Sequence, residues 1–65
     1  MNFTIELEQE NDGRWLAEVL DLPGVLVYGQ SKEDALDKVQ ALALRALAER
    51  LEHGEVAPVL VEMAS

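Results

Sequence analysis

Residues 2–20, NFTIELEQENDGRWLAEVL, decide the fold class of this chain. Apolar and polar residues alternate from Asn2 to Gln9 and again from Arg14 to Leu20, which is the period of a half-buried β-strand. The residues between the two runs include Asn11, Asp12 and Gly13, and these residue types favour tight turns. The segment therefore predicts a β-hairpin.

The chain after the hairpin predicts a third strand and a helix start. The sequence Asp21-Leu22-Pro23-Gly24 interrupts the second strand, because Pro lacks a backbone donor and Gly adopts conformations that other residues avoid. A short apolar run, Val25–Tyr28, predicts a third strand of a meander, and Gly29-Gln30 predicts the turn that follows it. Ser31 stands in the N-cap position of a helix, with Asp34 three residues later as the acid of a capping box.

The segment Lys32–His53 predicts one amphipathic helix. Steps of 100° place on one arc Ala35, Leu36, Val39, Leu42, Ala43, Ala46 and Leu47. The same steps place on the opposite side Asp34, Asp37, Lys38, Arg45, Glu49 and Glu52. Gly54 follows as the expected C′ residue.

A fourth strand is expected in the segment Glu55–Met63, which is rich in Val. Pro58 cannot donate to a β-ladder, so this strand should lie at an edge or begin at Val59. The expected fold is thus α+β in the order β-β-β-α-β, with an antiparallel sheet covered on one face by a single helix, in one domain over residues 1–65.

The charge of the chain limits its function. Thirteen acidic residues stand against five basic ones, so the formal net charge is −8 at pH 7. This charge repels phosphate backbones, and we expect no direct nucleic-acid binding. Cysteine is absent, which excludes disulfides and thiolate chemistry. No apolar run approaches the roughly 18 residues of a membrane span, and no secretory leader is recognisable. We expect a cytoplasmic protein that binds no membrane.

Carboxylates are the first candidates for chemistry. Glu6, Glu8, Glu18 and Asp21 fall on or beside one face of the predicted hairpin, where clustered carboxylates can bind metal or act as an acid–base pair. Alternating Glu on an exposed strand face also arises from binary patterning alone, and we favour that interpretation. His53 suits the end of a helix dipole, and the glycines match no phosphate-binding spacing. We therefore expect no enzyme, no metal and no cofactor.

Apolar residues on the far side of the sheet predict association. If Trp15, Ala17 and Val19 face the helix, Leu16 and Leu20 face away from it. Leu44 also lies at the margin of the apolar arc of the helix. Exposed apolar patches on so small a domain usually mark an interface, and a small core adds a reason to self-associate. The sequence predicts a homo-oligomer, a dimer or tetramer, or a partner interface.

Several motifs occur in a fixed order along nearly the whole chain. They are Phe3–Glu8, Gly13–Ala17, the D-L-P-G loop at Asp21–Gly24, Gly29-Gln30-Ser31, Glu33-Asp34-Ala35-Leu36 and Pro58. This ordered set resembles the HicB-like antitoxin family of type II toxin–antitoxin systems. Two positions depart from the family pattern: Gln30 replaces the usual Asp at the helix start, and Leu20 replaces a common Pro.

The resemblance implies a degraded RNase H-type fold and an antitoxin that neutralises a small basic RNA-cleaving toxin of the HicA type. Partner-binding residues would then be Glu6, Glu8, Glu18, Asp21, Leu16 and Leu20. Full-length relatives usually add a C-terminal DNA-binding domain, and this chain stops at Ser65, so we expect no such domain. Two alternatives remain open: an orphan structural or small-ligand-binding oligomer without a toxin, and a residual metal-dependent nuclease.

Overall fold

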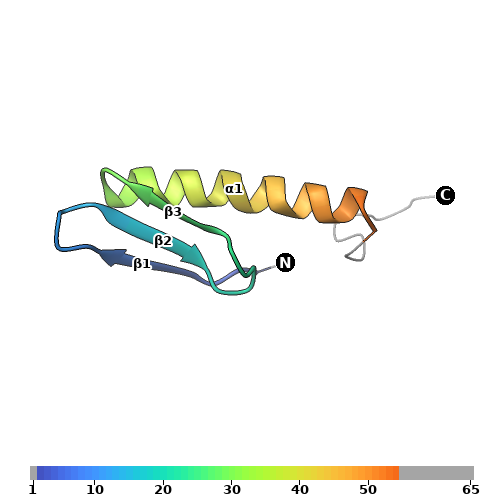
Figure 1. Cartoon of the computed structure of the whole chain (residues 1–65), viewed down its shortest axis with the longest axis horizontal. Coiled ribbons are helices and arrows are strands. Elements are labelled where there is room, and N and C mark those ends of the chain that lie inside the picture. The colour runs from blue at the N-terminus through green and yellow to red at the C-terminus, as the bar shows by residue number, and fades with distance from the viewer. Residues whose placement is uncertain (1, 55–65) are drawn as a thin grey trace.

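Three antiparallel strands and one helix make up the part of the chain that the computed structural model describes, residues 2–54. The elements are β1 (Ile5–Gln9), β2 (Trp15–Val19), β3 (Leu26–Gly29) and α1 (Lys32–Glu52). The strand order is β1-β2-β3, and α1 lies along one face of the sheet (Figure 1). The α+β fold with a single covering helix is confirmed.

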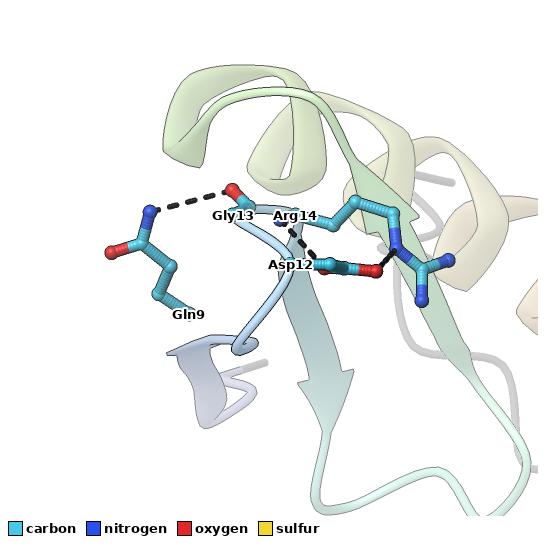
Figure 2. A network of polar contacts seen from close by, with 4 residues as sticks. All are labelled: Gln9, Asp12, Gly13 and Arg14. Atoms are coloured by element: carbon cyan, nitrogen blue, oxygen red, sulfur yellow. Dashed lines mark hydrogen bonds and ion pairs between the residues drawn. The ribbon is translucent and has the colours of Figure 1, made fainter.

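The hairpin closes through a short turn with internal hydrogen bonds. The Glu10 N–H donates to the Arg14 carbonyl at 2.7 Å, and the Gly13 N–H donates to the Glu10 carbonyl at 3.0 Å. Gly13 has a φ of +91°, a left-handed conformation that L-residues with side chains rarely adopt. The Gln9 side-chain amide donates to the Gly13 carbonyl at 3.3 Å (Figure 2). The predicted hairpin is confirmed.

The loop between β2 and β3 adds two side chains to the core. The Leu22 N–H donates to the Val19 carbonyl, and the Val25 N–H donates to the Leu22 carbonyl, so the chain turns tightly. Leu22 and Val25 are both buried. The sequence predicted only a strand break here, whereas the turn also brings its apolar residues under the helix.

Strand β3 is displaced by one residue from the prediction. Val25–Tyr28 was expected, with Gly29 in the following turn, but the strand includes Gly29, which is buried. A Cβ at Gly29 would lie 2.7 Å from the Ala35 Cα, closer than real Cβ contacts permit. Gly29 is therefore required because the first turn of α1 packs directly on the backbone of β3.

The predicted N-cap is confirmed. The Asp34 N–H donates to Ser31 Oγ at 3.0 Å, which satisfies one of the free donors of the first turn. The Asp34 carboxylate accepts the Gln30 N–H at 2.9 Å and pairs with Lys38 at 3.0 Å. The hydrogen bond from the Gln30 N–H, first, and the one from the Lys38 ammonium, second, lower the pKa of Asp34 below its ordinary value.

Helix α1 ends one residue before the predicted boundary. Glu52 is its last residue, and His53 is the C-cap, with its N–H donating to the Glu49 carbonyl at 3.1 Å. Gly54 follows with a φ of +70°, as its predicted C′ role requires. The expected fourth strand, Glu55–Met63, lies outside the described residues.

Small side chains fill the core between sheet and helix. The buried residues are Ala17, Val19, Leu22, Val25, Ala35, Val39 and Ala43. Partly buried residues around them are Phe3, Ile5, Leu7, Trp15, Val27, Leu42, Ala46 and Leu47. The predicted apolar arc of the helix is confirmed except at Leu36, which is half-buried and lies outside this cluster.

Helix α1 does not qualify as a membrane span. Among residues 2–54, no helix combines the length and the apolar character that crossing a bilayer requires. Its outward side carries charged, exposed residues such as Asp37 and Arg45. Its buried side chains, Ala35, Val39 and Ala43, pack against the sheet.

Candidate binding face of the sheet

Within residues 2–54, one face of the sheet has no helix over it, because α1 covers only the other (Figure 1). Side chains alternate between the two faces along each strand. Ala17 and Val19 point to the helix and are buried, so their strand neighbours point away from it. The name "open face" is used below for the residues on the uncovered side: Glu6, Glu8, Leu16, Glu18, Leu26 and Tyr28.

Strand register arranges the open face in two rows. Glu6 lies opposite Glu18, which in turn lies opposite Leu26. In the second row, Glu8 lies opposite Leu16, and Leu16 lies opposite Tyr28. Carboxylates therefore occupy the β1 side of the open face and apolar side chains occupy the β3 side, with Leu26 and Tyr28 44% and 43% exposed.

The pair Glu6 and Glu18 is electrostatically unfavourable in the isolated chain. Directly opposed residues on neighbouring strands have Cβ atoms about 4.5–5.5 Å apart, and like charges there are destabilising. The ion pairs found among residues 2–54 are Asp12–Arg14 and Asp34–Lys38, neither of which involves Glu6 or Glu18. The open face thus holds two adjacent negative charges without a cation from this part of the chain.

Arg14 borders the open face at the hairpin end. Its guanidinium carbon lies 4.3 Å from the centroid of the Tyr28 ring, a cation–π geometry. Asp12 holds this arginine: its carboxylate accepts the Arg14 backbone N–H at 3.0 Å and the Nε–H at 2.7 Å (Figure 2). These two hydrogen bonds, the backbone one first, lower the pKa of Asp12.

Asp21 and Leu20 lie beyond the end of β2, not within the sheet. The Asp21 carboxylate accepts the Thr4 N–H at 2.7 Å, and the Leu20 N–H donates to the Thr4 carbonyl at 3.0 Å. Asp21 thereby ties the start of β1 to the loop after β2. Leu20 remains 50% exposed beside this junction.

The structure brings together four of the six predicted partner-binding residues: Glu6, Glu8, Leu16 and Glu18. Leu20 and Asp21 lie at the margin of this group. Sequence reasoning missed Leu26 and Tyr28, which complete the apolar side of the open face, and Arg14, which stacks on Tyr28. Alternation of Leu26 and Tyr28 within the third strand was the available signal, since Val27 must then face the helix.

Metal ligation finds no support in the carboxylates of the described chain. No group of three or more His, Cys, Asp or Glu side chains placed to hold a metal ion occurs among residues 2–54. Glu6 and Glu18 are opposed as a pair, and Asp21 is engaged with the Thr4 backbone. The arrangement suits charge and surface complementarity to another molecule.

Comparison of the chain with family models, with curated proteins and with solved structures found no match.

Proposed function

We propose that this chain is a HicB-like, antitoxin-type binding protein that neutralises a small basic RNA-cleaving toxin by covering its RNA-binding surface. The observation that carries the proposal is the composition of the open face: Glu6 opposite Glu18, next to exposed Leu26 and Tyr28. A partner that carries basic side chains next to an apolar patch would complement both the carboxylates and the apolar side chains of this surface. The protein acts in the cytoplasm under this proposal.

Electrostatics supports a basic protein as the occupant. The chain has a formal net charge of −8, and complementary charge accelerates the encounter of two proteins while rejecting wrong partners. Placing a cationic side chain beside Glu6 and Glu18 removes a repulsion that the free chain carries. The partner's basic residues would then be unable to hold RNA.

The apolar half supplies affinity. Aromatic residues and arginine are enriched among the side chains that dominate binding energy in protein interfaces. Tyr28 is presented with Arg14 stacked on it, and Asp12 fixes this arginine. The hairpin end of the open face is therefore pre-ordered for contact, which lowers the entropic cost of binding.

The test is binding and inhibition with a small basic RNA-cleaving protein encoded beside the gene for this chain. We expect the two proteins to co-purify and RNA cleavage to stop at equimolar ratio. The variant Glu18→Lys should weaken binding by about a hundredfold, since it reverses a charge within the interface. Asp37→Lys, a matched change on the outward side of α1, should have a much smaller effect.

Failure of every such basic protein to bind would reject the proposal in favour of an orphan oligomer. Equal weakening by Glu18→Lys and Asp37→Lys would show that only the overall charge matters, and would reject the open face as the binding site. Binding of a small ligand with no protein partner would support the alternative of a ligand-binding oligomer.

A further inference from the structure

A second exposed apolar surface lies on α1, away from the open face. Leu44 is the most exposed large apolar residue of the described chain at 67%, and Leu51 is 43% exposed. Leu44, Leu47 and Leu51 are spaced by three and four residues, so they form one stripe on the helix surface. Ala48 lies beside them and is exposed. The name "leucine stripe" is used for Leu44, Leu47, Ala48 and Leu51.

The stripe borders an apolar groove of about 220 Å³. The sheet contributes Phe3, Ile5 and Val19 to this groove, and the helix contributes Gln40, Ala43, Leu44 and Leu47. It exists because α1 packs mainly over β2 and β3 and least over β1. A side chain arriving from outside can therefore bury itself between the helix and β1.

Helix length explains why the C-terminal end of the stripe has no strand of the described chain beneath it. A helix of 21 residues spans about 32 Å, whereas a strand of five residues spans about 17 Å. The last turns of α1 accordingly extend past the strands (Figure 1). In the described part of the chain, these last turns can be approached without contact with the sheet.

Charge distinguishes this half of the helix from the rest of the described chain. Residues 44–53 contain two basic residues, Arg45 and Arg50, and two acidic ones, Glu49 and Glu52. Residues 2–43 contain nine acidic and three basic residues. A second copy of this acidic protein is thus repelled almost everywhere except at the end of α1.

We infer that a second copy of this chain docks on the leucine stripe, with the two α1 helices antiparallel and overlapping through residues 44–52. Centring the pair between Leu47 and Ala48 places Leu44 of each copy opposite Leu51 of the other. Each Leu51 then lies at the groove of the opposite copy, which that copy's own Leu44 and Leu47 line. The interface is isologous and closes as a twofold dimer.

The antiparallel arrangement is favoured over the parallel one because it keeps the two acidic sheets apart. In the antiparallel pair, Arg45 comes within about 3 Å along the axis of Glu52 of the second copy. The antiparallel pair also holds the two acidic sheets at opposite ends of the dimer, which leaves both open faces accessible.

The test is the mass of the full chain in solution by sedimentation equilibrium, with no basic partner present. We expect a dimer. Leu44→Glu should weaken it about a hundredfold without loss of helical circular dichroism, because this side chain is mostly exposed. Leu26→Glu, a matched change on the open face, should leave the dimer intact.

Charge exchange tests the orientation of the helices. Arg45→Glu should weaken the dimer about tenfold, and the added change Glu52→Arg should restore it. Absence of rescue overturns the antiparallel pairing.

Three other results overturn the proposal. One is a monomer at every concentration. Another is a dimer that dissociates with Leu26→Glu but not with Leu44→Glu, which would identify the open face as the self-interface. The third is a monomer whose melting temperature falls with Leu44→Glu, which would identify residues 55–65 of the same chain as the occupant of the groove. None of these results involves the basic partner, so they leave the proposed function to its own test.

Discussion

The two faces of the sheet differ in side-chain size at the centre of β2 and β3, in an unexpected direction. At its centre the covered face carries Ala17 and Val27, which lie opposite each other. The open face carries the larger Leu26 and Tyr28 in neighbouring positions. A chain under selection for stability alone would bury its large apolar groups, because buried area stabilises a fold roughly in proportion. The difference leaves Leu26 and Tyr28 exposed on the open face.

The small residues of the covered face have a geometric cause. Helix α1 approaches β3 so closely that Gly29 has no room for a Cβ beside Ala35. Val19 and Val39 are the largest side chains that are fully buried. The close approach of α1 to β3 gives dense packing but a small core. We therefore expect the isolated chain to have a small free energy of unfolding.

Gly29→Ala should have the largest effect and would break the contact of helix and sheet. The added methyl group meets the Ala35 backbone, so the helix must shift, and we expect a loss of about 3 kcal/mol in the free energy of unfolding. Urea denaturation followed by circular dichroism measures it. Gly13→Ala is the control: its Cβ meets nothing within 4 Å, and only its positive φ should cost about 1 kcal/mol. Equal losses would contradict the close-approach argument.

Val39→Ala and Leu26→Ala compare the two faces directly. Val39 is fully buried, and its truncation should cost about 2 kcal/mol by leaving a cavity. Leu26 loses more atoms, yet its truncation on the open face should cost less than about 0.5 kcal/mol. Thermal unfolding of both variants measures the difference. A larger loss for Leu26→Ala would mean that the open face is covered in solution.

Glu18→Gln should stabilise the isolated chain slightly. It removes the like-charge pair with Glu6, and we expect a gain of a few tenths of a kcal/mol in the free energy of unfolding. The gain should shrink at high salt, where exposed charges are screened. Asp37→Asn on the outward side of α1 is the charge-matched control and should give no comparable gain. A loss of stability in Glu18→Gln would reject the repulsion on which the proposed function relies.

Acid should weaken the hairpin end of the open face and the start of α1 together. The pKa values of Asp12 and Asp34 are lowered in the folded chain, so the unfolded chain binds more protons in the acid range. Their stabilising contribution is complete above their unfolded pKa, about 3.9, and is lost as the pH falls through the lower folded value.

Carboxyl NMR titration measures both groups, and Asp12→Asn should remove the acid dependence of the Tyr28 ring signals without altering the helix start. A Tyr28 response that persists in Asp12→Asn would contradict the role of Asp12 in holding Arg14.

The resemblance to HicB-like antitoxins stays a prediction, and so does its implication of an RNase H-type fold. The resemblance rests on the order of the sequence motifs. The open face is defined from the strand register and does not depend on the resemblance. The open face and the leucine stripe are described by residues that a binding assay and a sedimentation experiment can test separately.

Local patterns were sufficient where the physics is local. Alternation predicted the hairpin, and the side-chain hydroxyl of Ser31 with Gly54 predicted both ends of α1 to within one residue. These features depend on backbone propensity and on contacts within a few positions. Two features escaped the sequence: burial of Leu22 inside a turn, and the displacement of β3 by one residue. Both result from the position of the helix on the sheet, which no short segment of sequence determines.

By itself, the sequence determined the element types, their order and the excess of negative charge, because these follow from residue period, capping and composition. Only the tertiary structure decided which face of the sheet α1 covers, and with it which carboxylates and leucines share an exposed surface. Register placed Glu6 opposite Glu18, and helix length left the last turns of α1 beyond the strands. These outcomes depend on contacts between segments distant in the chain, where packing and not local preference selects the arrangement.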